Sequence, residues 1–160
     1  MTLTLDLQTA CPAPAPDAAE LRRWLDCTLA EAGHGHDAEI AVRIMGEREM
    51  ATLNRQYRQR EGSTNVLSFP ADFPDGVDLP LLGDIAICAP VVLREAREQG
   101  KPTDSHWAHM TIHGCLHLLG YDHIGMRDAA RMEMLETRIL AALGIPCPYT
   151  PAIQEEHVAS

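Results

Sequence analysis

Three closely spaced histidines are the residues of this 160-residue chain best suited to chemistry. They are His113, His117 and His123, in the segment HGCLHLLGYDH. Four residues turn an α-helix by about one full turn, so the first two imidazoles share one face. Gly120 can end that helix in a left-handed turn and bring His123 toward the pair. Three neutral imidazoles with a fourth position open to water are the ligand set of a catalytic zinc site.

A structural role is the alternative interpretation of these histidines. A lone histidine on a partly apolar helix is usually structural, but three at these offsets, with a glycine at the turn, favour a metal site. The same spacing occurs in metzincin peptidases, which carry a general-base glutamate directly after the first histidine. Gly114 occupies that position here and cannot transfer a proton. The sequence therefore disfavours a peptidase of that type.

Three neighbours of the histidines have open roles. His109 lies one helical turn before His113, and it could hydrogen-bond a substrate or a group that supports the ligands, or be structural. Asp122 could orient a ligand or transfer a proton, or it could cap the turn. Cys115 points elsewhere on the helix, so we expect it to pack in the core.

Hydrophobic periodicity and turn residues predict the elements that must position these side chains. Ile40, Val42 and Ile44 alternate with smaller or polar residues, which is typical of a strand with one buried face. The complete prediction is strands over 2–8, 40–44, 65–69 and 83–88, and helices over 17–32, 47–58, 90–99, 103–119 and 127–143.

This order of elements predicts an α/β (α+β) fold. We expect a single layered domain over 1–149, with a mixed sheet of about four strands packed by about five helices. The metal site would lie at the C-terminal end of helix 103–119. Residues 150–160 are expected to form a flexible tail, because the chain end is rich in proline and glutamate.

The charge of the chain limits its possible partners. It has 13 Lys and Arg against 23 Asp and Glu, a formal net charge of −10. Such a chain does not coat nucleic acid by general charge attraction, so any nucleic-acid role must rest on a local patch. Segment 43–60 is a candidate, with five arginines against two glutamates.

Cysteine usage and hydropathy indicate the compartment. The five cysteines lack a C-x-x-C pair, so neither a disulfide framework nor a zinc ribbon is indicated. The N-terminus has no basic region followed by a long apolar run, and no segment is a continuous apolar span. We expect a cytoplasmic protein with no membrane association.

The sequence resembles the YbeY endoribonucleases of bacteria, which are also described as ribosomal RNA maturation factors. The resemblance rests on HGCLHLLGYDH at 113–123, STNVLSFP at 63–70 with Tyr57 and Arg58 upstream, and GDIAIC at 83–88. It implies zinc held by His113, His117 and His123, and an arginine facing the metal cleft, which corresponds to Arg58. The family is linked to maturation of the 3′ end of small-subunit ribosomal RNA and to ribosome quality control.

One loop departs from the pattern of the family. Residues 60–64 stand where the family commonly has Lys-Asp-x-Pro-Thr, and this chain lacks that proline. We expect the loop to be looser for that reason.

These observations suggest a zinc-dependent endoribonuclease that acts on single-stranded RNA. Zinc brings the pKa of water to about 7, and a guanidinium such as that of Arg58 can bind two phosphate oxygens. The chain has only 4% aromatic residues, too few for a base-stacking sheet, so backbone contacts should dominate. We expect ribosomal RNA and ribosomal proteins or assembly factors as partners, and no DNA.

Other interpretations stay open at this point. A metal-dependent peptidase or another hydrolase could use the same three histidines, and in a non-catalytic ribosome-assembly factor the metal would only brace the fold. Imidazole ligands also accept other divalent metals such as nickel. Either water or the RNA 2′-hydroxyl could be the nucleophile.

Overall fold

The elements of the structure follow the predicted order. The computed structural model describes residues 2–60, 62–74, 79–121, 125–146 and 148. Within these ranges each predicted strand and helix is confirmed, with ends that differ by no more than about two residues. The elements are β1 (Leu3–Thr9), α1 (Ala18–Glu31), β2 (Ala38–Met45), α2 (Glu47–Arg58), β3 (Val66–Pro70), β4 (Leu81–Cys88), α3 (Ala89–Glu98), α4 (Thr103–Leu118) and α5 (Met126–Ala142).

The four strands form one mixed sheet with the order β1-β2-β4-β3. β1 pairs with β2 and β2 with β4 in parallel, and helices lie in the connections between them. β3 is antiparallel to β4 and forms one edge of the sheet. This arrangement confirms the predicted α/β fold.

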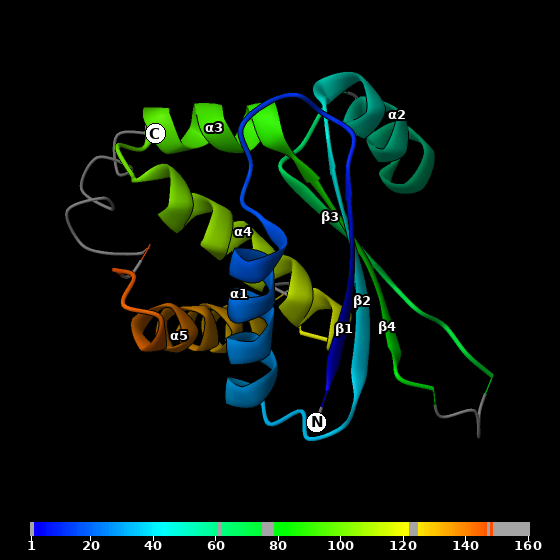
Figure 1. The fold of residues 1–160 in the computed structure, drawn as a ribbon, viewed down its shortest axis with the longest axis vertical. Coiled ribbons are helices and arrows are strands. Elements are labelled where there is room, and N and C mark those ends of the chain that lie inside the picture. The colour runs from blue at the N-terminus through cyan, green and yellow to red at the C-terminus, as the bar shows by residue number, and fades with distance from the viewer. Residues whose placement is uncertain (1, 61, 75–78, 122–124, 147, 149–160) are drawn as a thin grey trace.

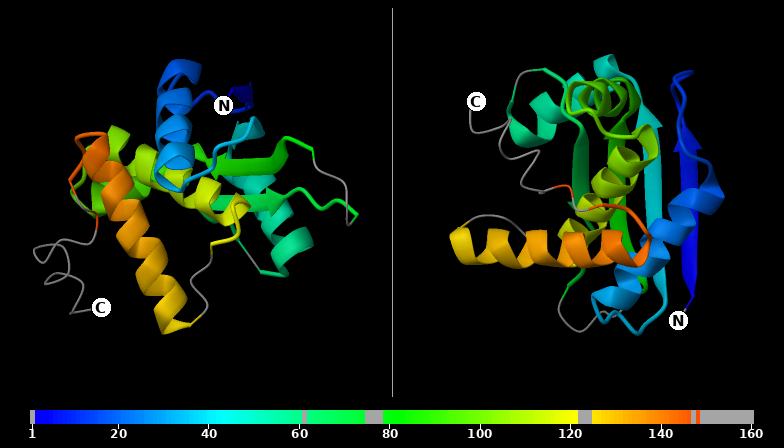
Figure 2. Two further views of the ribbon diagram at one scale, coloured as in Figure 1. Left: turned by 90° about the horizontal axis from the view of Figure 1, so that it is seen from below. Right: turned by 90° about the vertical axis from the view of Figure 1, so that its left-hand side faces the viewer.

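Helices cover the two faces of the sheet unequally. α1 and α4 lie on one face with α5 packed against them, and α2 lies on the other (Figures 1 and 2). Ile40, Val42 and Ile44 of β2 are buried in the larger core on the α4 side, as their alternation predicts. A smaller cluster, which includes Met50 of α2, fills the other side.

Gly114 lets α4 pass close to the sheet. A Cβ at this position would lie 2.9 Å from Ile85 Cγ2, 3.2 Å from Val66 Cγ2 and 3.3 Å from Ser68 Oγ. The Ser68 hydroxyl also donates a hydrogen bond to the Gly114 carbonyl, at 2.9 Å. The close approach places the α4 histidines beside the edge strand β3.

The C-terminal end of α4 is a Schellman motif. The Tyr121 N–H donates to Leu116 O, and the Gly120 N–H donates to His117 O, both at 3.0 Å. Gly120 has φ 100°, in the region that favours glycine. The predicted left-handed turn is therefore confirmed, directly after the last turn of the helix, which contains His117.

Among the described residues, none of the helices has the length and apolar character needed to cross a bilayer. The predicted boundary at residue 149 concerns a part of the chain outside the described ranges, so the flexible tail stays a prediction.

Replacing Gly114 by alanine should destabilise the fold. Alanine favours a helix by about 1 kcal/mol over glycine, but forcing a methyl group into a packed site costs about 1–3 kcal/mol. We expect a net loss in the free energy of unfolding, measured by urea titration. Gly35→Ala is the control, because a Cβ there would meet nothing within 4 Å. A Gly114→Ala protein as stable as the parent would contradict the tight approach of α4.

Candidate active site

His113 and His117 present their Nε2 atoms to each other. The two nitrogens are 3.1 Å apart, and the rings lie nearly perpendicular with centroids 4.6 Å apart. Two imidazoles that bind zinc at about 2.0–2.1 Å in tetrahedral geometry have their nitrogens roughly 3.3 Å apart. The pair therefore fits two corners of a tetrahedral metal site, as the helical spacing predicts.

Glu136 of α5 holds His113 from behind. Its Oε2 accepts a hydrogen bond of 2.6 Å from His113 Nδ1, since a carboxylate can only accept. With the proton on Nδ1, the Nε2 of His113 keeps its lone pair for a metal ion. This carboxylate–imidazole pair is the usual support of a histidine ligand.

The Glu136 carboxyl lies in the core, since its side chain is only 1% exposed. Burial raises the pKa of the Glu136 carboxyl, but hydrogen bonds from His109 and His113 outweigh burial and lower the pKa to about 2. Sequence reasoning missed this residue. The signal was available, since Glu136 lies on the same helical face as Met132, Ile139 and Leu140, where a charge is unexpected.

His109 is buried at Glu136, and its ring lies edge-on to that of His113, with centroids 6.4 Å apart. Its Nε2 lies 3.4 Å from Glu136 Oε1, and the residue is 7% exposed. Burial lowers the pKa of His109, and this outweighs the attraction of Glu136, so the ring is neutral at pH 7. Its position favours the supporting role over direct contact with a substrate.

Arg58 shares a cavity with His113 and His117. The cavity has a volume of about 440 Å³. Its walls come from the end of α2, the segment that leads into β3, the β3 residues on the α4 side and the end of α4: Arg58, Thr64, Asn65, Val66, Ser68, Pro70, His113, His117, Gly120 and Tyr121. The three described residues expected at the metal cleft thus line one cavity, which we call the histidine cavity.

Asn54 ties the loop after Arg58 back to α2. Its buried side-chain amide donates to Gly62 O at 3.0 Å, and its backbone carbonyl accepts from the Arg60 N–H at 3.3 Å. These contacts fix the direction in which the chain leaves Arg58.

A second polar network lies behind the histidine cavity. Glu95 of α3 accepts hydrogen bonds from His106 Nε2 at 2.8 Å and from Asn65 Nδ2 at 3.1 Å. Burial raises the pKa of Glu95, but the hydrogen bonds from His106 and Asn65 more than offset it, so the pKa is lowered. Asn65 Oδ1 also accepts from the Val66 N–H. The network fixes the start of β3, one wall of the cavity.

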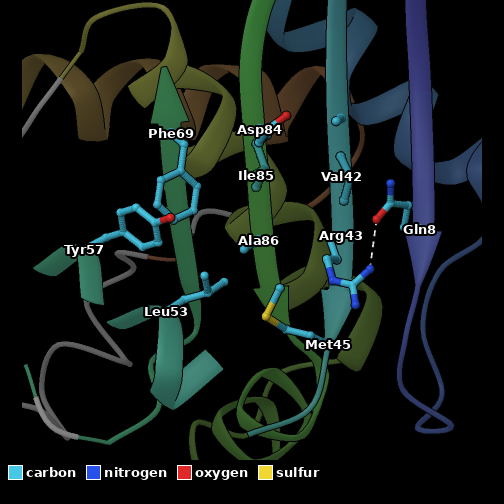
Figure 3. A pocket seen from close by; sticks show the side chains of 11 residues that line it. Gln8, Val42, Arg43, Met45, Leu53, Tyr57, Phe69, Asp84, Ile85 and Ala86 are labelled. Carbon is cyan, nitrogen blue, oxygen red and sulfur yellow. Dashed lines mark hydrogen bonds between the residues drawn. The ribbon is translucent and has the colours of Figure 1, made fainter. Parts of the chain in front are cut away.

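A different cavity, of about 450 Å³, opens on the α2 side of the sheet (Figure 3). Tyr57 and Phe69 form its aromatic wall, with ring centroids 5.2 Å apart. Arg43, also in its lining, donates to Glu49 and Gln8. The two cavities have similar volumes, but among the described residues that line this one there is no imidazole. Of these two cavities, the histidine cavity is therefore the one whose side chains could hold a metal ion next to a guanidinium.

The remaining predicted residues have different outcomes. His123 and Asp122 lie outside the described residues, so the third ligand and the role of Asp122 stay predictions. Cys115 is fully buried, and burial raises the pKa of its thiol to about 12, as expected of a packing residue. Of the five arginines between 43 and 60, Arg58 lines the histidine cavity and Arg43 lines the cavity of Figure 3.

The structure is thus an α/β protein with two imidazoles and a guanidinium in one cavity. Such a set of side chains is typical of hydrolases that act on phosphate esters. The chain belongs to the family of the endoribonuclease YbeY, because the model of that family matches residues 12–144. This membership supports an endoribonuclease role.

Similar proteins agree with this family. The endoribonucleases YbeY of Stutzerimonas stutzeri (strain A1501) and Pseudomonas entomophila (strain L48) are each 57% identical to this chain over 148 residues. These matches cover 92% of this chain, and 91% and 93% of the two relatives. The solution structure of TM1509 from Thermotoga maritima is 23% identical, with a TM-score of 0.54 over 89% of this chain and 91% of that one. That likeness shows a shared fold.

The Glu95 network should make stability depend on acid. The folded-state pKa of Glu95 lies below its ordinary value of 4.5, so its contribution is present above about pH 4.5 and is lost as pH falls through the lower folded value. Between about pH 5.5 and 3.5, we expect the unfolding free energy of Glu95→Gln to fall less than that of the parent. Glu98→Gln, an exposed change on the same helix, is the control. Equal acid sensitivity of Glu95→Gln and the parent would argue against the network.

Proposed function

We propose that this protein is a zinc-dependent endoribonuclease that cleaves single-stranded RNA. Family membership supports the endoribonuclease role. The observation that carries the finer proposal is the pair of Nε2 atoms, 3.1 Å apart, in the cavity that also contains Arg58. His123 would complete the ligand set, and nickel is an alternative ion for the same ligands.

The residues of the chain have separate tasks in this proposal. His113 and His117 hold the ion, and Glu136 keeps His113 in the tautomer and orientation that a ligand needs. When bound, zinc would supply Lewis acidity toward a phosphate oxygen and lower the pKa of water. His109 supports Glu136 through the other carboxylate oxygen, Oε1.

Arg58 provides the positive charge for the phosphodiester. The residue is exposed at the end of α2, and no described residue forms a hydrogen bond or ion pair with its side chain. A guanidinium in this position can donate two parallel hydrogen bonds to phosphate oxygens, and these bonds strengthen as negative charge develops during cleavage. Arg58 is thus the catalytic residue of the proposal.

The size of the cavity favours a single strand as the substrate. A volume of about 440 Å³ admits a nucleotide, whereas proteins recognise an RNA duplex over its broad minor groove. Such a site contacts the backbone and selects sequence poorly. We therefore propose that ribosomal proteins or assembly factors direct the enzyme in the cytoplasm to ribosomal RNA, for maturation of the small-subunit 3′ end and for ribosome quality control.

The contacts of Gly114 weigh against a peptidase. A metzincin needs a glutamate there, but even a Cβ at this position would lie 2.9 Å from Ile85 Cγ2 and 3.2 Å from Val66 Cγ2, so the sheet leaves no room for that side chain. The alternative of a non-catalytic assembly factor is excluded if the zinc-loaded protein cleaves RNA.

The first prediction from this proposal separates zinc binding from catalysis. His117→Ala should lose both bound zinc and cleavage of a labelled 3′-end precursor of small-subunit ribosomal RNA. Arg58→Ala should keep zinc and lose about 100- to 1,000-fold in kcat, because one charge-stabilising donor is gone. Arg55→Ala is the matched control, an exposed arginine of α2 that does not line the cavity.

Each measurement has an outcome that contradicts one assignment. Zinc retained by His117→Ala would exclude the metal site, and full cleavage by Arg58→Ala would exclude its catalytic role. If the zinc-loaded parent cleaves no RNA, the protein is a non-catalytic assembly factor. If it digests casein, it is a peptidase. The chemistry of the product ends identifies water or the 2′-hydroxyl as the nucleophile.

A second prediction concerns Glu136. In Glu136→Gln, an amide oxygen still accepts from one histidine, but the NH₂ group opposes the N–H of the other. We expect zinc affinity to fall about 10- to 100-fold, measured by competition with a chelator. Glu133→Gln, an exposed change on the same helix, should bind zinc like the parent. Equal affinities of the two variants would show that Glu136 does not support the ligand.

A further inference from the structure

A second polar hollow adjoins the histidine cavity. It has a volume of about 360 Å³ and lies between the end of α4 and the first turns of α5; its lining is Leu119, Gly120, Tyr121, Asp128 and Arg131. Gly120 and Tyr121 line both hollows, so the two adjoin at the α4 terminus. The residues of this second hollow have no part in the proposed cleavage.

The boundary between the two hollows is fixed and open. The Schellman hydrogen bonds hold Gly120 and Tyr121 against the last turn of α4. Gly120 is exposed, and a Cβ there would meet no atom of the described residues within 4 Å. A ligand that crosses this turn would meet no side chain from Gly120 itself.

Arg131 gives the second hollow a positive group. Its side chain is exposed, and within the described part of the chain it forms no hydrogen bond or ion pair. Arg127 lies four residues earlier on the same helical face. The first turns of α5 extend past the other helices (Figure 2), so these arginines are accessible to a strand that leaves the histidine cavity.

We propose that the hollow at Arg131 is a second phosphate subsite for the RNA strand. The strand passes from Arg58 across His113 and His117, over Gly120 and Tyr121, and a phosphate further along it binds Arg131. The Asp128 carboxylate in the same hollow opposes the binding of an anion, so Arg131 supplies the attraction. The inference rests on the proposed function, since it takes RNA as the ligand of the histidine cavity.

The position of the two hollows next to each other favours a strand over a free anion. An arginine and an aspartate in an open hollow bind an isolated phosphate weakly, since the carboxylate opposes it and solvent screens the guanidinium. A phosphate that is covalently linked to one at Arg58 binds at a high effective concentration. The subsite should therefore matter for oligonucleotides and not for a dinucleotide.

The test compares Arg131→Ala with Arg97→Ala, an exposed arginine of α3 that lines neither hollow. The substrates are a labelled oligoribonucleotide of about eight residues and a dinucleotide with one phosphodiester. For Arg131→Ala we expect about a tenfold loss in kcat/KM on the longer substrate, mostly in KM, and a salt dependence reduced by about one phosphate contact. Cleavage of the dinucleotide should match the control.

Binding of a 2′-O-methyl oligonucleotide of the same length, read by fluorescence anisotropy, supplies a measurement that does not need cleavage. Arg131→Ala should bind it about tenfold more weakly than Arg97→Ala does. Equal binding by the two variants would overturn the subsite, as would an equal loss on the dinucleotide and the longer substrate. A parent that binds the oligonucleotide but cleaves no RNA would contradict the proposed function alone.

Discussion

The site depends on the buried carboxylate of Glu136. A charge that is 1% exposed is tolerated only with hydrogen-bond partners, and a hydrogen bond to a charged group contributes about 1.5–3 kcal/mol. Its partners, His109 and His113, both belong to α4, so the carboxylate fixes the rotation of α4 against α5. That rotation decides where the Nε2 of His113 points. Stability and ligand geometry thus depend on the same two hydrogen bonds.

The close approach of α4 to the sheet is a second constraint, and it depends on a glycine, which has no side chain. Gly114 brings the helix against Val66 and Ile85, and Ser68 closes the contact with a hydrogen bond. The residue before Gly114 is His113, so the close approach holds the imidazole of His113 next to β3. The segment that leads into β3 is held by Asn65 and Glu95, and its other end by Asn54. Arg58 and the histidines therefore share a cavity although they lie on opposite sides of the sheet edge.

The sequence predicts local features well and pairings between distant segments poorly. The i, i+4 spacing of His113 and His117 and the turn at Gly120 follow from helix geometry alone, and the structure agrees. Glu136 is 23 residues from His113, and no local rule links them. Its charge on an apolar helical face indicates a buried partner but does not identify one. For the arginine-rich segment 43–60, the sequence shows the charge but not where each side chain lies. Arg43 donates hydrogen bonds to Glu49 and Gln8 on the α2 side of the sheet, so only part of the positive charge of the segment lies at the histidine cavity.

Net charge and local charge act over different distances, which reconciles an acidic protein with an RNA substrate. The repulsion between a chain of net charge −10 and RNA is screened beyond about 8–10 Å at physiological salt. The contact of a guanidinium with a phosphate acts at hydrogen-bond distance and survives that screening. Acidic residues over the rest of the surface then disfavour RNA bound away from the cavities. A strand gains most where Arg58, the histidine pair and Arg131 follow one another, so the acidic exterior contributes to selectivity by leaving few favourable places for a phosphate backbone.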